Sequence, residues 1–353
     1  MIPMPQASRR RLDWHYIIQE AIEFAHKFKD EQGFPTTLRG IFYYLVSKNL
    51  IPNTPNAYKY LSKKLSKGRL EGYIQLDLKD DTRKIYIPPS TETPRTEWLE
   101  KLTRDELIRI LRNIFGGRLN KWDSQPYRPI IVVEKNTLYS PIQSLVENEK
   151  LDVPVVLSRG FQSTTVILRL ADMINRINEE DATAIILLIS DLDPSGWYIE
   201  RDYDRRLRKA GAKNFIMRKI MVVEEDIIKY PDIPPEPLDH SEIVKMERDP
   251  RYKAYVEHFE PIFSRMSHVH DPKHVRVEVD ALMSLKPDYF KQKIINSVMQ
   301  FFNEQIYKQK EEEFKKLDEE FEKKLEEKVR ELLGMHDEKK DDESKEREKD
   351  GSS

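Results

Sequence analysis

The sequence predicts an α/β protein in which a small helical domain precedes a domain built on a mainly parallel sheet, and a long helix follows. Two observations predict this class. Between residues 129 and 223, short and uniformly apolar runs alternate with helical patterns, which is typical of parallel strands covered by helices on both faces. From residue 301 onward, apolar residues recur at spacings of three and four in a strongly charged segment, which indicates one long helix.

Residues 1–90 are the first predicted domain. Thr37 is expected to cap a helix and Gly68 to end one, because a threonine side chain accepts a backbone N–H at a helix start and glycine disfavours the helix interior. Three helices followed by a β-hairpin is the order of a winged helix, which is a DNA-binding fold. The helices are expected over 13–29, 37–48 and 56–67, and the strands over 73–77 and 84–87.

Residues 126–300 are the second predicted domain, and residues 91–125 form a helical connector with a helix at about 96–115. Ligands of a parallel sheet bind beyond the carboxyl ends of its strands, so the residues that follow each strand are candidates for a site. The strands are expected over 129–133, 153–157, 184–189 and 215–223, and the helices over 138–149, 163–178 and 195–210, with several short helices in 224–300.

The predicted C-terminal helix covers residues 301–336 and carries a narrow apolar seam. A seam of this kind would suit a dimer contact. Residues 337–353 are nearly all charged or small and are expected to be disordered. The seam consists of Phe314, Leu317, Phe321, Leu325, Val329 and Leu332.

The chain has 353 residues, of which 35% are charged, and it contains no cysteine. Disulfides, thiol catalysis and cysteine-ligated zinc or iron–sulfur sites are therefore excluded. No apolar stretch approaches the roughly 18–20 residues of a membrane span, and no secretory signal is evident, so we expect a cytoplasmic protein. Residues 1–128 carry 23 basic and 15 acidic side chains, a net charge of +8. This excess favours a polyanion as the partner of the N-terminal third.

Acidic residues follow two of the predicted strands directly. Glu134 comes after the strand at 129–133, and Asp191 and Asp193 follow the strand at 184–189. Carboxylates crowded at one edge of a sheet repel each other unless a cation lies among them, and Mg²⁺ prefers oxygen ligands. The pattern predicts a Mg²⁺ site that could neutralise charge on a phosphodiester oxygen. The alternative is that Asp191 and Asp193 only cap the helix that follows them.

The second predicted helix carries two adjacent tyrosines. Arg39 and Tyr43 are four residues apart and share one flank of the helix, whereas Tyr44 points elsewhere. A guanidinium beside a phenol would favour the phenolate and could bind the phosphate that it attacks. Tyr43 is thus a candidate nucleophile for breaking a DNA strand, since a tyrosyl phosphodiester keeps the energy of the broken bond. The alternative is that Tyr43 is one more half-buried aromatic residue.

Five basic residues on and just after the third predicted helix form a candidate DNA-binding face. Apolar residues of the same helix occupy another arc, and no acid interrupts the basic run. Such a face suits binding to the phosphate backbone that is salt-sensitive and of low sequence specificity. The alternative is a solvated lysine face. The five residues are Lys59, Lys63, Lys64, Lys67 and Arg69.

Three motifs resemble those of a Toprim domain, the metal-binding fold shared by type IIA and type VI topoisomerases and some nucleases. With a tyrosine-bearing winged helix ahead of them, they resemble the topoisomerase VI A-subunit family, which includes the meiotic double-strand-break protein, over about residues 15–290. The likeness is greatest to stand-alone prokaryotic and plasmid members of that family. Gly40 stands where many members have an acid, and Ser195 where some Toprim proteins have a third Asp. The motifs are Val132-Val133-Glu134-Lys135, Ser158-Arg159-Gly160 and Asp191-Leu192-Asp193-Pro194-Ser195-Gly196, after Arg39-Gly40-Ile41-Phe42-Tyr43.

The resemblance implies a homodimer that makes Mg²⁺-dependent double-strand breaks in duplex DNA, as the cleaving chain of a type IIB topoisomerase does. Tyr43 of one protomer, with Arg39 beside it, would attack a phosphodiester near the metal that Glu134, Asp191 and Asp193 hold in the other. The sequence has no ATPase phosphate-binding loop, so strand passage would need a separate ATPase B subunit. Two alternatives stay open: a metal-dependent hydrolytic nuclease in which Tyr43 is dispensable, and a non-catalytic DNA-binding module.

Two further groups of polar residues are open to more than one interpretation. Glu278 and Asp280 alternate out of a predicted strand, and they could border the metal site or serve the structure alone. A histidine cluster could ligate zinc, but a surface cluster is the favoured interpretation because no carboxylate partner is evident. The cluster consists of His268, His270 and His274.

Overall fold

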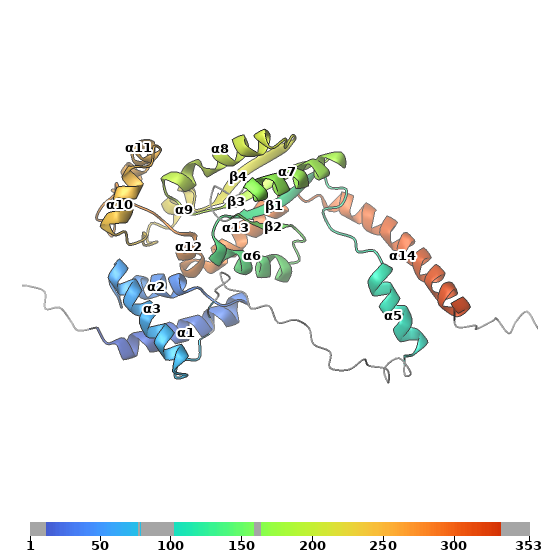
Figure 1. Cartoon of the computed structure of the whole chain (residues 1–353), viewed down its shortest axis with the longest axis horizontal. Coiled ribbons are helices and arrows are strands. Elements are labelled where there is room, and N and C mark those ends of the chain that lie inside the picture. Colours follow the sequence, from blue (N-terminus) through green and yellow to red (C-terminus); the bar gives the residue numbers. More distant parts are fainter. Residues whose placement is uncertain (1–11, 77, 79–101, 159–163, 333–353) are drawn as a thin grey trace, which may run out of the picture. The chain divides into compact units, whose positions relative to one another are not determined.

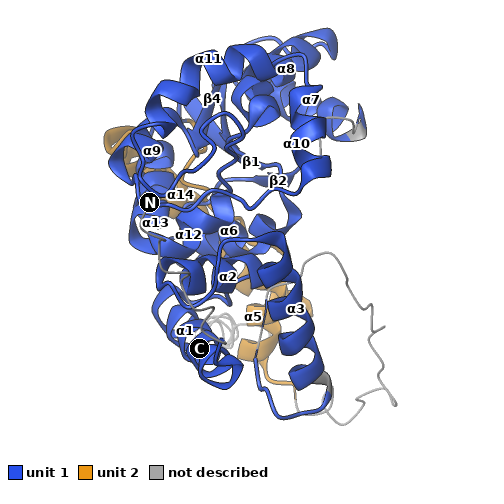
Figure 2. Cartoon of the chain, turned by 90° about the vertical axis from the view of Figure 1, so that its left-hand side faces the viewer, with its two compact units in different colours: residues 1–84, 125–302 blue, residues 85–124, 303–353 orange. Residues whose placement is uncertain are grey.

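A computed structural model describes residues 12–76, 78, 102–158 and 164–332 of the chain (Figure 1). The chain divides into two compact units, which Figure 2 colours separately. Unit 1 comprises residues 1–84 and 125–302, and unit 2 comprises residues 85–124 and 303–353. Both the N-terminal helices and the sheet belong to unit 1. Among the described residues, no helix combines the length and the apolar character needed to cross a membrane.

Three helices open unit 1, as the sequence predicts. Thr37 caps the second helix by accepting the N–H of Gly40, and Thr54 caps the third in the same way. Gly33 ends the first helix with a φ of 78°, a left-handed conformation that glycine adopts without steric cost. The helices are α1 (Trp14–Gln32), α2 (Leu38–Ser47) and α3 (Pro55–Leu70).

The end of α3 differs from the prediction. The helix passes through Gly68 and continues to Leu70, because glycine makes room there for the returning chain: a Cβ on Gly68 would overlap the side chain of Ile74. Residues 73–76 carry no strand, so the first strand of the predicted hairpin is wrong within these residues. A strand needs a paired neighbour, and the predicted partner at 84–87 lies outside the described residues.

The sheet has four parallel strands in the order β2-β1-β3-β4, which confirms the predicted parallel α/β arrangement. The six residues from Ala184 to Ile189 in β3 are all 0% exposed, so both faces of the sheet are covered. Two helices, α7 and α8, pack on one face and share its core, and α6 and α13 lie on the other (Figure 1). The bounds are β1 (Tyr127–Val133), α6 (Asn136–Asn148), β2 (Val155–Leu157), α7 (Thr164–Glu179), β3 (Thr183–Ile189), α8 (Pro194–Lys209) and β4 (Phe215–Met221).

A short buried helix, α12, joins the N-terminal helices to the sheet (Figure 1). It packs against α2 at Gly40, where a Cβ would overlap the hydroxyl groups of Ser284 and Thr36. Glu278 precedes this helix as its N-cap rather than ending a strand, so the predicted strand there is wrong. An isolated bridge between Leu192 and Val277 forms beside it. The remaining helices of unit 1 are α9 (Glu224–Lys229), α10 (His240–Glu247), α11 (Tyr252–Phe263), α12 (Val279–Leu285) and α13 (Pro287–Met299).

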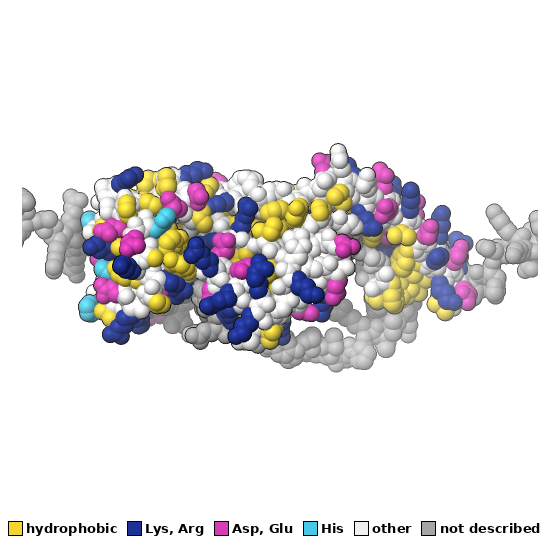
Figure 3. Space-filling model, turned by 90° about the horizontal axis from the view of Figure 1, so that it is seen from above, with side chains coloured by type: hydrophobic (Ala, Val, Ile, Leu, Met, Phe, Trp, Pro, Cys, Tyr) yellow, Lys and Arg dark blue, Asp and Glu magenta, His cyan; other side chains and the backbone are white. Residues whose placement is uncertain are grey.

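Unit 2 contains two helices in its described part, α5 (Arg104–Phe115) and α14 (Glu304–Leu332). The predicted connector helix begins at Arg104 because Thr103 and Glu106 form a reciprocal capping box; residues 96–101 lie outside the described residues. The long charged C-terminal helix is confirmed. Figure 3 shows apolar side chains gathered over this pair of helices.

Candidate active site

The three predicted acidic residues lie at the same edge of the sheet. Glu134 directly follows β1, and its N–H donates to the carbonyl of Ile189 at the end of β3. Asp191 and Asp193 follow β3. The strand order reverses direction between β1 and β3, and such a switch point is where parallel sheets bind their ligands. The fold therefore brings the predicted acids to its best-placed ligand-binding edge.

Backbone contacts fix the loop that carries the two aspartates. Asp193 caps α8 by accepting from the N–H of Gly196 at 2.6 Å, so capping is one role of this residue. Asp191 instead accepts from the N–H of Val279 at 2.8 Å, at the start of α12. Gly196 is required at its position because a Cβ there would overlap the carbonyl oxygen of Asp191. Asp191 thus holds two elements of the site together, which sequence spacing alone does not reveal.

The crowding of the acids changes their proton affinity. Burial, reinforced by the charges of Asp191 and Asp193, raises the pKa of Glu134 to about 7. Lys219 donates from Nζ to the carbonyls of Asp191 and Gly196, at 2.7 and 3.0 Å. Burial lowers the pKa of this lysine to about 8 even though the neighbouring acids oppose the change. The acids are therefore only partly neutralised by the protein itself.

The predicted metal ligands are close but are not arranged as a cage. Within the ranges that the structure describes, no three His, Asp or Glu side chains are grouped so as to hold a metal ion. The chemistry of the donors fits Mg²⁺, since Glu134, Asp191 and Asp193 supply carboxylate oxygens. Their mutual repulsion is only partly offset by Lys219, by Lys135 at 3.7 Å from Asp191 and by Arg276 at 3.6 Å from Asp193. To bind the ion together, these side chains would have to turn toward one another.

Tyr43 lies fully buried against Glu278. Its hydroxyl donates to Oε2 of Glu278 at 2.6 Å, and Nη1 of Arg39 lies 2.5 Å from the same oxygen. Burial and the neighbouring Glu278 carboxylate raise the pKa of Tyr43 well above its usual value of 10.0, and the opposing effect of Arg39 is smaller. Arg39 does lower the pKa of Tyr43, as expected, but burial and Glu278 together outweigh it, and Arg39 is itself paired with Glu278 and, at 3.0 Å, with Glu236.

Lys135 connects the tyrosine to the acids. Its Nζ lies 2.6 Å from Glu278, 2.7 Å from Asp280 and 3.7 Å from Asp191. Burial by itself would lower the pKa of Lys135, but these carboxylates raise it. A continuous path of contacts therefore runs from Tyr43 through Glu278 and Lys135 to Asp191.

Sequence reasoning assigned no role to three charged residues of this site. Lys135 stands next to Glu134, and a lysine directly after a strand-end acid is the signal that could have singled it out. Lys219 stands beside Arg218 in a strand whose other residues are apolar, and basic residues in such a strand are also a usable signal. Glu236 follows two prolines in an irregular segment, and nothing in its surroundings predicts that it will be 8% exposed and paired with Arg39 and Arg276.

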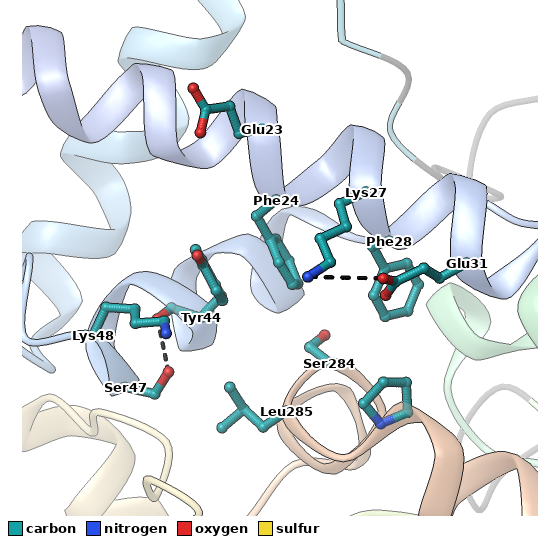
Figure 4. Close-up of a pocket in the computed structure, with 11 residues that line it drawn as sticks. Glu23, Phe24, Lys27, Phe28, Glu31, Tyr44, Ser47, Lys48, Ser284 and Leu285 are labelled. Carbon is teal, nitrogen blue, oxygen red and sulfur yellow. Dashed lines mark hydrogen bonds and ion pairs between the residues drawn. The ribbon is translucent and has the colours of Figure 1, made fainter.

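Tyr44 points away from this network, as predicted. Its ring stacks on Phe24 with centroids 4.0 Å apart. Both rings line a cavity of about 410 Å³ between α1, α2 and the start of α13, with Phe28 and Leu285 nearby (Figure 4). The two adjacent tyrosines of α2 therefore have separate environments, which makes Tyr44 a natural control for Tyr43.

The basic residues of α3 lie on its outer face. Ala57, Leu61 and Leu65 are 8%, 0% and 1% exposed, so the apolar arc faces the core as predicted. Lys64 lies over the ring of Tyr60 at 5.4 Å, and Lys67 pairs with Glu71 at 3.6 Å. Four of the five predicted DNA-binding residues are exposed and Lys64 is half-buried: Lys59, Lys63, Lys64, Lys67 and Arg69.

The three predicted histidines contact different groups. His274 bonds Asp271 at 2.7 Å and Glu247 at 3.1 Å, and His268 contacts the carbonyl of Ile233 at 3.2 Å. His270 lies exposed. His274 therefore has two carboxylate partners, which the sequence interpretation did not expect, and the described contacts do not bring the three histidines to one shared partner.

Comparisons with known proteins give no match: no family model, no curated protein and no solved structure is similar to this chain.

Proposed function

We propose that this chain cleaves duplex DNA in a Mg²⁺-dependent reaction with Tyr43 as the nucleophile, as its resemblance to the topoisomerase VI A-subunit family implies. The observation that best supports the proposal is the path of contacts from Tyr43 through Glu278 and Lys135 to Asp191. Tyr43 and Glu278 are 235 positions apart in the sequence. Their contact brings a candidate nucleophile and a candidate metal site, found from unrelated patterns, into one network.

The contacts assign a role to each side chain in this reaction. The phenol of Tyr43 already donates to Glu278, so Glu278 can take the proton as the phenolic oxygen forms a bond to phosphorus. The phosphorus–oxygen bond to the deoxyribose breaks, and the leaving oxygen takes a proton from solvent. Arg39 can bind the phosphate. A Mg²⁺ held by Glu134, Asp191 and Asp193 would neutralise the charge that develops on the phosphate oxygens.

DNA can reach Tyr43 only if α2 separates from α12, since Tyr43 is 0% exposed. In the homodimer that the resemblance implies, α2 of one protomer would then meet the sheet edge of the other, and the same contacts would form between copies. The exposed basic face of α3, which follows α2 directly in the chain, would hold the duplex through its phosphates. Strand passage would further need a separate ATPase protein.

A metal-dependent hydrolytic nuclease is the second candidate, and one observation favours it. Tyr43 is buried and its pKa is raised, whereas the pKa of Glu134 is about 7. A carboxylate with a pKa near neutrality is well suited to accept a proton from an attacking water. In this mechanism the tyrosine is dispensable and no covalent intermediate forms.

The deciding experiment incubates supercoiled plasmid and Mg²⁺ with the wild type and with Tyr43→Phe, Tyr44→Phe and Asp191→Ala. Products are separated in denaturing detergent with and without protease. Linear DNA that is released only after protease, and that is lost in Tyr43→Phe and Asp191→Ala but kept in Tyr44→Phe, would support the tyrosyl mechanism. Cutting that survives Tyr43→Phe and needs Asp191 would support the nuclease. DNA binding without cutting would contradict both and leave a DNA-binding module.

A further inference from the structure

The two helices in the described part of unit 2 form an antiparallel pair. Ion pairs join Arg104 to Glu326 at 3.8 Å, and Arg112 to Asp318 and Glu322 at 2.9 and 2.6 Å. Residues later in α5 pair with residues earlier in α14, so the two helices run in opposite directions. These ion pairs also identify which flank of α14 faces α5.

The helix α5 contacts only one side of the apolar seam of α14, and the other side, which we call the open flank, is exposed. Val329 lies on the flank of Asp318 and Glu322 and is 0% exposed. At 100° per residue, Leu317 lies about 120° around the helix from Val329, and it is 64% exposed. Leu332 is 71% exposed. The seam residues Phe314, Phe321 and Leu325 lie between the two flanks and are half-buried.

The helix α5 is covered even less. It has a clear apolar side, yet none of its residues is buried. Ile114 and Phe115 are 64% and 67% exposed. Two packed helices cannot enclose a core, so a pair of this kind is normally covered by further helices. The open flanks of α5 and α14 together form an apolar face, and apolar side chains are visible over these helices in Figure 3.

We propose that this face binds the same face of a second copy of the chain, forming an antiparallel four-helix bundle in which the two α14 helices cross at Phe321. The charges on the open flank favour this occupant. When Phe321 of one copy lies opposite Phe321 of the other, Leu317 of each copy faces Leu325 of the other. In this register, each basic residue on the open flank of one α14 lies opposite a position that is at most two residues from an acidic residue of the other α14. Lys310 pairs with Glu313 at 3.0 Å and Lys328 with Glu331 at 2.8 Å within the helix. The antiparallel arrangement places these two ion pairs opposite each other with unlike charges facing, Lys310 near Glu331 and Glu313 near Lys328, and it places Glu320 near Lys324. A parallel pairing would instead place each charge against itself.

The proposal is independent of the proposed function, because the bundle can form whether or not the chain cleaves DNA. The full-length protein should be a dimer by light scattering after gel filtration at micromolar concentration. Leu317→Glu and Ile114→Glu should each raise the dimer dissociation constant at least tenfold. Leu168→Glu is the matched control, since Leu168 is 53% exposed on α7 of unit 1, and it should have no effect. A monomeric wild type, or a dimer unchanged in both variants, would overturn the proposal.

The absence of cysteine allows a direct test of the register. Glu320→Cys and Glu313→Cys place single thiols one heptad apart on the open flank. With Phe321 at the crossing point, the two copies of residue 320 lie close together, whereas the two copies of residue 313 lie about 24 Å apart along the axis at 1.5 Å per residue. A short thiol-to-thiol cross-linker should therefore join Glu320→Cys chains and leave Glu313→Cys chains single. Equal cross-linking of both variants would refute the antiparallel arrangement.

Discussion

Glu134→Gln should remove a specific pH dependence from the stability of the protein. Burial and the charges of Asp191 and Asp193 raise the carboxyl pKa of Glu134 from 4.5 to about 7. Between these two values the folded protein holds a proton that the unfolded chain has released. Because the folded state binds more protons in this range, the free energy of unfolding falls as the pH rises from about 4.5 to about 7 and stays lower above it.

The magnitude follows from the size of the shift. A change of about 2.5 pKa units corresponds to at most about 3.4 kcal/mol, and partial exposure of the side chain to solvent reduces this. Glutamine is neutral at every pH and close in shape. The variant should thus match the wild type near pH 5 and be more stable by about 1–3 kcal/mol at pH 8 in the absence of divalent metal.

The assay is urea unfolding of both proteins in EDTA at a series of pH values between 5 and 8. Titrating groups that do not interact with Glu134 contribute equally to both curves, so the difference between the two proteins reports Glu134 together with Lys219, whose pKa depends in part on the charge of Glu134. The exposed Glu257 on α11 provides the matched control, and Glu257→Gln should leave the profile unchanged. Parallel profiles for the wild type and Glu134→Gln would refute the claim that the acids at this edge of the sheet repel each other.

Three further perturbations test the packing and the DNA-binding face. Gly196→Ala places a methyl group against a backbone carbonyl of the aspartate loop and should lower the free energy of unfolding by about 1–3 kcal/mol; an unchanged urea midpoint would contradict this geometry. Gly40→Ala should lower it by about 1–2 kcal/mol even though alanine favours helices by about 1 kcal/mol, because two buried hydroxyls fill the space; a more stable variant would show that α12 does not approach α2 so closely. Lys63→Glu with Lys64→Glu should weaken DNA binding for every sequence and reduce the slope of log affinity against log salt by about 0.9 for each DNA phosphate that the variant no longer neutralises; retention at low salt equal to that of the wild type would mean that the duplex binds elsewhere.

The sheet and its acidic edge were predictable because their signals are local. Each strand is a short apolar run, and β3 is buried along nearly its whole length, so its sequence reads as uniformly apolar. These local runs do not predict the order of the strands in the sheet, but parallel strands place their carboxyl ends at one edge whatever that order is. Glu134 and Asp191 could therefore be assigned to one edge before any contact was known.

The environment of Tyr43 was not predictable in the same way. Helical spacing places Arg39 beside it, and both residues do converge on one carboxylate. That carboxylate is Glu278, which is 235 positions away in the sequence and reaches α2 only because α12 packs at Gly40. Burial, which is the largest cause, and this distant carboxylate together raise the pKa of Tyr43, so helical spacing predicts the effect of Arg39 but not the net direction.

Lys135 makes the tyrosine and the acids respond to each other. Its ammonium group is shared between Glu278 at 2.6 Å and Asp191 at 3.7 Å. Lys135 also lies 2.7 Å from Asp280, so this one buried ammonium group is in contact with two carboxylates and faces a third. A change of charge at Asp191 therefore reaches Glu278, and through Glu278 the hydroxyl of Tyr43, by way of a single side chain.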